Sequence, residues 1–400
     1  MTAPSEWTER LAALLVDFGA NVQPGQLVLV SSDVGKEDLT RMVAERCYER
    51  GARYVEVRYG DPWVRRARLR HAPLDSLDLT PSWDLERVRA LGDAGAALVR
   101  LEGAVAPTLL ADLDPERVGR ERPPAAREQL RLIAERRVNW TIGPCPVPGW
   151  AEQVHPDLEP AAALECLWEE IRHVCRLDEP DPVAAWEERM NETSGAAARL
   201  TERRFDRVLL EGPGTELSVG LVPSSRWIAA RESTAFGVTH HPNLPSEEVF
   251  TTPDPERTEG VVTSTRPLQL GGTMVEGLRV RFAGGRAVEI EAERGADVLR
   301  TRAAADEGAA RLGELALVDD ESRIGRLGTV FYDTLLDENA ASHLALGAGL
   351  DFLLDEADAW RSNESAIHVD FMVGGAAVDV TGVTAEGERV AVLRDGEWRI

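Results

Sequence analysis

The chain of 400 residues contains very little lysine and cysteine. Lys36 is the only lysine among 45 basic residues, which disfavours Schiff-base chemistry and metal sites that use a lysine ligand. The four cysteines (Cys47, Cys145, Cys166 and Cys175) form neither a CxxC pair nor a zinc-finger spacing, so the corresponding metal sites are excluded. This cysteine usage favours a reducing cytoplasm.

Long apolar runs and excess positive charge are also missing. No stretch reaches the roughly 20 apolar residues of a membrane-spanning helix, and the N-terminal residues lack the basic segment of a secretory signal peptide. The formal net charge of −24 argues against nucleic-acid binding, which needs clustered cations, and suits the attraction of metal ions or ammonium groups. We therefore expect a cytoplasmic protein with neither nucleic acid nor a membrane as a partner.

Length and periodicity predict two domains. In the first half, amphipathic helices alternate with short apolar strands, for example over residues 6–20 and 26–32. This alternation is typical of an α/β domain with a mostly parallel sheet and flanking helices. The acidic segment 177–186 contains two prolines and is typical of a linker. We therefore place an N-terminal domain at residues 1–180 and a second domain at residues 181–400.

Strand patterns dominate the second half, after a charged helix over residues 187–204. Gly284 and Gly285 mark the turn of a hairpin. Residues 337–349 predict another helix, and residues 366–375 predict a strand. The second domain is therefore expected to have a mixed α+β fold.

Four ionisable side chains interrupt the apolar segments of the last quarter of the chain. His368 and Asp370 alternate with apolar residues, so a strand places both on one face, with Cα atoms roughly 7 Å apart. Glu338 and His343 are five residues apart, and from the expected helix both can border one cavity. The alternatives are an exposed strand face for the first pair and an ordinary helix start for Glu338, where a carboxylate complements the helix dipole.

Three more carboxylates precede them in the same domain. Glu314 opens an otherwise apolar strand, and Glu247 and Glu248 follow a proline turn. A helix-capping box is the alternative for this pair, but the β-branched residues that follow and Pro253 disfavour a helix. Carboxylates and imidazoles are costly to bury without a partner. Together they suit Zn²⁺, Co²⁺ or Mn²⁺, including a pair of ions bridged by a carboxylate.

Other motifs offer no comparable site. The chain has no GxSxG and no HExxH, and the segment around Lys36 lacks the first glycine and the Ser/Thr of a P-loop. His240 and His241 stand just before the turn that carries Glu247, and could line a substrate pocket. The remaining histidines lie in charged contexts and are expected at the surface: His71, His155 and His173.

Four motifs together resemble the metallo-aminopeptidase family of aminopeptidase T and aminopeptidase S. They are NLPSEEVFTTP (243–253), LGELALV (312–318), LLDENAASHLALG (335–347) and AIHVDFMVGG (366–375), and the resemblance runs in order along nearly the whole chain. It implies a homodimer of chains with an N-terminal α/β domain and a C-terminal catalytic domain. The implied reaction is the removal of N-terminal residues from peptides or amino-acid amides that carry a free N-terminus.

The resemblance also implies a site for two divalent metal ions (Zn, Co or Mn). Its implied ligands are Glu248, Glu314, His343, His368 and Asp370, with Glu338 as a further member. A glutamate that is not fully engaged as a ligand can take a proton from the attacking water. Glu248 and Glu314 are both candidates for this base, and the sequence does not choose between them.

One departure from the family stands beside this site. The family places a tyrosine seven residues after the position of His343, and here that position is Leu350. A tyrosine hydroxyl can donate a hydrogen bond to a developing oxyanion, and leucine cannot. The segment 351–365 is also shorter than is usual in the family. These differences imply another donor, a specialised substrate or a slow peptidase.

Other classes of protein remain open on the same residues. His343, His368 and Asp370 alone form the two-histidine, one-carboxylate set of non-haem iron oxygenases, and a ring-cleaving dioxygenase resembles this peptidase family. The presence of both Glu248 and Glu314 argues against such a mononuclear iron site. A non-peptidase amide hydrolase and a non-catalytic binding protein are the further alternatives.

Overall fold

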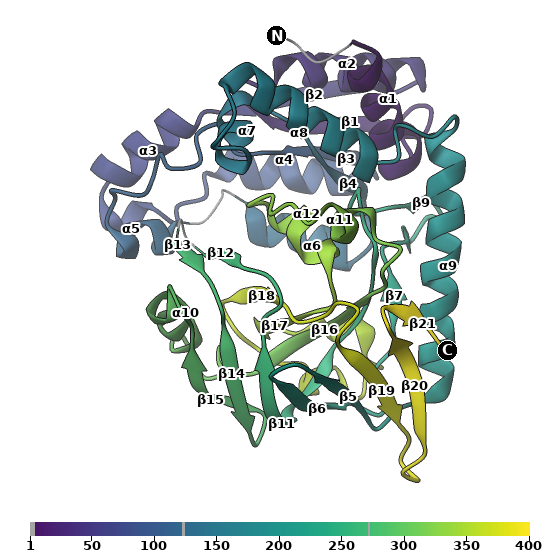
Figure 1. Cartoon of the computed structure of the whole chain (residues 1–400). Helices are drawn as coiled ribbons and strands as arrows, with labels where there is room; N and C mark the ends of the chain where they lie inside the picture. The colour runs from purple at the N-terminus through teal and green to yellow at the C-terminus, as the bar shows by residue number, and fades with distance from the viewer. Residues whose placement is uncertain (1–4, 122–124, 271–272) are drawn as a thin grey trace. The chain divides into compact units, whose positions relative to one another are not determined.

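In the computed structural model of this protein, the described residues are 5–121, 125–270 and 273–400 (Figure 1). Among these residues, no helix combines the length and the apolar character that crossing a bilayer requires.

The described chain divides into two compact units. The first is built from Met1–Trp186 and Arg231–Pro245, and the second from Glu187–Ala230 and Ser246–Ile400. The segment Arg231–Pro245 therefore belongs to the first unit, although it follows the start of the second along the chain. The domain boundary between residues 180 and 181 stays a prediction.

The first unit contains a four-stranded sheet in the order β2-β1-β3-β4, and each neighbouring pair is parallel. Parallel neighbours require crossover connections, which helices supply here. The expected α/β fold with a parallel sheet is thus confirmed. The strands are β1 (Leu27–Asp33), β2 (Tyr54–Gly60), β3 (Ala97–Glu102) and β4 (Asn139–Pro144), with the short pair β8 (Glu232–Ser233) and β9 (Thr239–His240).

Helices surround this sheet in Figure 1, and local capping sets where they begin. For example, Asp61 Oδ1 accepts a hydrogen bond of 2.8 Å from the backbone N–H of Trp63, and Pro62 occupies the first helical turn of α3. The helices are α1 (Ser5–Ala13) with its π-helical continuation η1 (Leu14–Gly19), α2 (Glu37–Glu49), α3 (Pro62–His71), η2 (Leu74–Ser76), α4 (Ser82–Asp93), α5 (Pro115–Arg120), α6 (Ala126–Ala134), α7 (Pro148–Val154) and α8 (Pro160–Val174).

The long helix α9 (Pro182–Arg203) begins inside the segment that was expected to be a linker. Asp181 Oδ1 accepts hydrogen bonds of 3.1 Å from the backbone N–H groups of Val183 and Ala184. The Asp-Pro pair is therefore a helix start, because the carboxylate satisfies free N–H groups and proline needs none. The linker expectation is wrong from Pro182 onward.

The second unit contains two large antiparallel sheets, as the predicted mixed α+β fold requires. The hairpin at Gly284 and Gly285 is confirmed by the pairing of β14 with β15. The eight-stranded sheet has the order β15 (Arg286–Glu291), β14 (Arg279–Ala283), β11 (Pro253–Thr263), β6 (Thr215–Leu221), β5 (Arg207–Gly212), β19 (Asp379–Val383), β20 (Arg389–Arg394) and β21 (Glu397–Trp398).

The five-stranded sheet has the order β18 (His368–Met372), β17 (His343–Gly347), β16 (Leu312–Val318), β10 (Glu248–Thr251) and β7 (Ile228–Ala229). The smaller elements of this unit are β12 (Leu268–Leu270), β13 (Thr273–Val275), α10 (Ala296–Ala303), α11 (Arg323–Leu327), α12 (Thr334–Asp337), η3 (Glu338–Ala340), η4 (Asp351–Leu353) and η5 (Ala359–Arg361).

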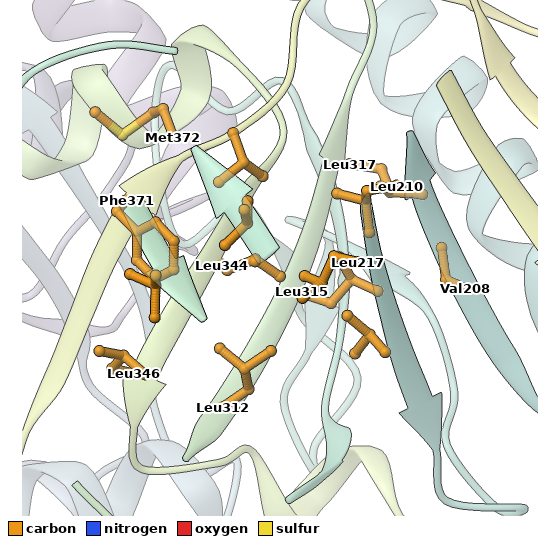
Figure 2. Packing of buried hydrophobic residues seen from close by; sticks show 14 of the residues in the cluster. Val208, Leu210, Leu217, Leu312, Leu315, Leu317, Leu344, Leu346, Phe371 and Met372 are labelled. Carbon is orange, nitrogen blue, oxygen red and sulfur yellow. The ribbon is translucent and has the colours of Figure 1, made fainter. Parts of the chain in front are cut away.

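Apolar side chains from both sheets form one core in the second unit (Figure 2). Leu210 and Leu217 of the eight-stranded sheet lie against Leu315 and Leu317 of β16, with Leu344 of β17 beside them. Burying each such leucine contributes roughly 1.5–3 kcal/mol. This packing commits one face of the five-stranded sheet to the core, so side chains at alternate positions point to the opposite face.

The helix predicted over residues 337–349 is wrong. α12 ends at Asp337, a single 3₁₀ turn follows, and His343 begins strand β17. The Asp337 carboxylate accepts hydrogen bonds from the backbone N–H groups of Phe331 (2.7 Å) and Asp333 (3.0 Å), so it is bound to the segment that leads into this short helix. From His343 onward the pattern has period two, with Leu344 and Leu346 in the core.

Candidate metal centre

The ionisable side chains that the sequence singles out come together on the face of the five-stranded sheet opposite the core. Strand alternation explains the placement, because each side chain is the direct neighbour of a core residue. Val249, Leu315, Leu344, Val369 and Phe371 are these core residues. Beside them stand Glu248 on β10, Glu314 on β16, His343 on β17, and His368 and Asp370 on β18.

Small residues face these side chains across the sheet and leave room for them. Ala316 pairs with His343, and Gly347 pairs with His368. Ala345 lies between Glu314 on one neighbouring strand and Asp370 on the other. Side chains directly opposite in an antiparallel pair are close enough to touch, so larger residues at these three positions would fill the space above the sheet.

Two groups of three ligands share one carboxylate. The side-chain ligand atoms of Glu248, Glu314 and His343 all lie within 4.8 Å of one another, and the same holds for Glu314, His368 and Asp370. His343 Nε2 is 3.2 Å from Glu248 Oε2 and 4.0 Å from Glu314 Oε1. His368 Nε2 is 3.2 Å from Glu314 Oε2 and 3.3 Å from Asp370 Oδ1. The two oxygens of Glu314 thus face two different histidines.

Backbone carbonyls orient both imidazole rings. His343 Nδ1 is 3.2 Å from the carbonyl oxygen of Ala341, and His368 Nδ1 is 3.0 Å from that of Ala348. A carbonyl oxygen only accepts, so each Nδ1 carries the hydrogen and donates it. Each Nε2 is left facing the carboxylates, which is the arrangement that metal-binding histidines commonly have.

The carboxylates of this cluster repel one another. Burial raises the pKa of Glu314 above its ordinary value, and the charges of Glu248 and Asp370 add to the rise against the opposing effect of His368. Burial also raises the pKa of Glu338 well above its ordinary value, again with repulsion from Glu248 and Asp370. Glu338 on η3 therefore lies within the electrostatic field of the cluster, although it belongs to neither group of three.

The same charges act in the opposite direction on the histidines. Burial alone lowers the pKa of His343, but Glu248, Asp370 and Glu314 outweigh this effect and raise it to about 10. Burial also lowers the pKa of His368, but the carboxylates of Asp370 and Glu314 outweigh this effect and raise it to about 12. Four carboxylates thus face two imidazoles, and their repulsion favours the binding of positive charge, whether protons or a cation.

The donor set fits a divalent metal. Glu248 Oε2 is buried and faces His343 Nε2 at 3.2 Å, so this oxygen points into the cluster beside the imidazole nitrogen. Carboxylate oxygens and imidazole nitrogens, without a thiolate, are ligands that Zn²⁺, Co²⁺ and Mn²⁺ accept. Such an ion would compensate the carboxylate charges that the buried cluster brings together.

Leu350 follows the end of β17 and supplies no hydroxyl. Its backbone N–H donates to Thr252 Oγ1 at 3.2 Å, and this hydroxyl donates to the carbonyl oxygen of Gly313 at 2.9 Å. The two bonds tie the segment after β17 to the strands that carry Glu248 and Glu314. The leucine therefore stands on a fixed backbone beside the ends of the site strands.

The histidines outside the cluster have other surroundings. His240 and His241 lie in the interior of the first unit, and their predicted role in a substrate pocket stays a prediction. His155 was expected to be solvated, but its side chain is only 17% exposed and its Nε2 lies 2.9 Å from Glu170. These two residues and Cys166 form a separate group with ligand atoms within 4.8 Å of one another.

Comparison with known proteins identifies the family. The chain matches the family described as thermophilic metalloprotease (M29) over residues 5–398. It is 43% identical to aminopeptidase T of Thermus aquaticus, over 100% of each chain, and 34% identical to aminopeptidase 2 of Geobacillus stearothermophilus, over 98% and 97%. The solved structure of wild-type AmpT from Thermus thermophilus superposes with a TM-score of 0.91 at 42% identity, covering 98% of this chain and 99% of that one.

The chain belongs to the M29 metalloprotease family. It is therefore a metal-dependent aminopeptidase and a hydrolase, and the predicted family resemblance is confirmed. The dioxygenase, the non-peptidase amide hydrolase and the binding-protein alternatives find no support in the relatives.

The sequence did not predict a buried charged network that lies next to the candidate metal centre. Arg189 on α9 joins Glu247 and Asp319, which are 58 and 130 residues away along the chain. Of these three residues, the sequence pattern singles out Glu247 alone, as the neighbour of Glu248. A single arginine in a charged helix gives no local signal that it will be buried, because its partners come from distant strands.

Proposed function

We propose that this M29 enzyme removes N-terminal residues from peptides with a free α-amino group, using two divalent ions. The ions would be held by Glu248, Glu314, His343, His368 and Asp370, with Glu338 as a further ligand. The observation that supports this proposal is the shared carboxylate: Glu314 belongs to both groups of three candidate ligands, so it could serve two neighbouring ions. Zn, Co and Mn all suit this oxygen- and nitrogen-rich set.

Bound metal ions would polarise the scissile carbonyl and lower the pKa of a water molecule toward neutrality. The protein side chains supply the rest of the chemistry. The formal net charge of −24 favours the approach of a substrate that carries an ammonium group at its N-terminus. The buried sheet face keeps the reacting groups in one orientation.

We assign proton transfer to a glutamate of the cluster, either Glu248 or Glu314. Either carboxylate can receive a proton from the attacking water. Both face histidine nitrogens: Glu248 Oε2 lies 3.2 Å from His343 Nε2, and the two oxygens of Glu314 face His343 and His368. The protonated glutamate would then deliver the proton to the leaving amine.

Metal analysis combined with a peptidase assay tests this proposal. The purified protein is depleted with a chelator, reconstituted with zinc, cobalt or manganese, and assayed on aminoacyl anilides, amino-acid amides and dipeptides. We expect about two ions per chain and hydrolysis that returns with the metal. One ion per chain at full activity would contradict the two-metal site, and equal cleavage of N-acetylated peptides would contradict recognition of the free amine.

We also propose that the enzyme is a cytoplasmic homodimer. The four cysteines are all free, which suits a reducing compartment, and the family resemblance implies the dimer. Sedimentation equilibrium at micromolar concentration measures the assembly directly. A mass of one chain would contradict the dimer, and activity confined to a secreted fraction of the source cells would contradict the location.

A further inference from the structure

Arg189 is a buried arginine that joins two buried carboxylates in the second unit. Its side chain is 4% exposed. Its Nε donates to Glu247 Oε2 at 2.6 Å, and its two terminal nitrogens reach the two oxygens of Asp319 at 3.1 Å and 2.6 Å. This paired contact with Asp319 uses the planar fork of the guanidinium, a geometry that lysine cannot reproduce.

Both partners of Arg189 are located where Glu248 enters the sheet. Glu247 directly precedes Glu248, and side chains at successive positions of an extended chain point to opposite sides. Asp319 directly follows Val318, the residue that pairs with Glu248 between β10 and β16. The guanidinium therefore links the start of β10, just before Glu248, to the end of β16, just after Val318.

Asn339 extends this network to the turn that carries Glu338, a second carboxylate of the cluster. Its Oδ1 accepts a hydrogen bond of 2.7 Å from the backbone N–H of Glu247, and its Nδ2 donates to the carbonyl oxygen of Leu335 at 3.1 Å. Ser322 Oγ donates to the Asn339 carbonyl oxygen at 2.8 Å. Asn339 is the neighbour of Glu338, so one amide side chain ties the turn that carries Glu338 to the strand that carries Glu248.

We propose that Arg189 is a positioning residue of the metal centre, which fixes the Glu248 and Glu338 carboxylates through Glu247, Asp319 and Asn339. This inference rests on the proposed function, because it takes Glu248 and Glu338 as metal ligands. Residues that orient metal ligands commonly change metal affinity or activity 10- to 100-fold when they are replaced. A purely structural ion pair would change the stability of the fold and leave the metal geometry alone.

The test uses Arg189→Lys and Glu247→Gln in the full-length protein. We expect both variants to bind cobalt at one of the two positions roughly 10- to 100-fold more weakly, measured by equilibrium dialysis, and to alter the visible absorption of bound Co²⁺. Arg257→Lys is the matched control. Arg257 pairs with Asp206 at 2.7 Å in the same unit, away from the network, and its replacement should leave affinity and spectrum unchanged.

Cobalt affinity and spectrum equal to those of the native protein in both variants, with only a lower melting temperature, would overturn the positioning role. If Arg189→Lys does not fold, Glu247→Gln decides, since glutamine keeps the shape of the side chain. Glu248→Gln separates the two proposals. If it still binds two ions, the ligand set is wrong; if it loses an ion while the Arg189 and Glu247 variants keep both, only the positioning role is wrong.

Discussion

Two buried histidines, one in each unit, have pKa values that are shifted in opposite directions. His241 in the first unit stacks on the ring of Phe18 at 3.8 Å, and its Nδ1 lies 3.1 Å from the Phe18 carbonyl oxygen. Burial lowers its pKa to about 4. His343 in the second unit is buried as deeply, yet its carboxylate neighbours raise its pKa to about 10.

The difference shows that the neighbours of a buried imidazole decide its role. Among apolar groups the imidazole stays neutral and acts as a packing side chain with one hydrogen bond. Among carboxylates the same ring is favoured in its charged form, and the surrounding carboxylates attract cations. The first arrangement stabilises a fold, whereas the second offers ligands that could hold a metal ion.

The largest expected effect comes from removing the carboxylate that both site histidines share. We expect Glu314→Gln to lower kcat/KM by about 10³-fold or more and to reduce the number of bound ions, without unfolding the protein. Metal analysis, circular dichroism and assays on a dipeptide measure the three quantities. Glu216→Gln, an exposed change on β6, is the control. Activity retained in Glu314→Gln would remove Glu314 from the centre.

Leu350→Tyr tests whether the M29 centre lacks a hydrogen-bond donor. A hydroxyl that reaches the developing oxyanion contributes on the order of 10²–10³ in rate, so we expect kcat to rise toward this limit with little change in KM. Leu350→Phe adds the ring without the hydroxyl and serves as the control. Equal rates for the Tyr and Phe variants would point to a specialised substrate.

Removing the metal should destabilise the site that contains His343 and leave the site that contains His241 unchanged. Ions at 100 times their dissociation constant stabilise the folded protein by about 2.7 kcal/mol, which corresponds to roughly 5–10 °C in melting temperature for a unit of this size. Differential scanning calorimetry with and without EDTA measures the shift. His241→Phe should show the same EDTA shift as the native protein, and Glu314→Gln a smaller one.

The sequence predicts most of this centre because strand alternation is a local signal. His368 and Asp370 alternate with core residues over five positions, so their shared face follows from period two alone. The same signal was present from His343 to Gly347, but the preceding segment resembles a helix start and the two patterns overlap. The helix prediction fails because the sequence pattern does not show that Asp337 binds the backbone N–H groups of Phe331 and Asp333 before the short helix.

The network of Arg189, Glu247 and Asp319 could not be predicted from the sequence, for a different reason. Arg189, Glu247 and Asp319 come from a helix, a strand start and a strand end that are far apart along the chain. Each is an ordinary charged residue in its own segment. Only the packing of α9 against these strand ends makes the arginine buried, and no periodicity records that contact.

The smallest expected effect concerns the pH dependence of stability in the first unit. The pKa of His241 is about 4 in the folded protein and about 6.5 in the unfolded chain. Between these values the unfolded chain binds the additional proton, so this histidine stabilises the fold above pH 6.5 and loses that contribution as the pH falls toward 4. Between pH 7 and pH 5 the resulting loss of stability is about 2 kcal/mol.

We therefore expect His241→Phe, which keeps a ring stacked on Phe18, to flatten the fall in unfolding free energy between pH 7 and pH 5. The metal centre and His240 titrate in both proteins, so the difference between native and variant curves isolates His241. Urea unfolding at a series of pH values measures these curves. Parallel curves would show that His241 takes up its proton in the fold as it does in the unfolded chain. The contrast between the two kinds of buried histidine would then fail, because the apolar site would tolerate a charged imidazole as the carboxylate site does.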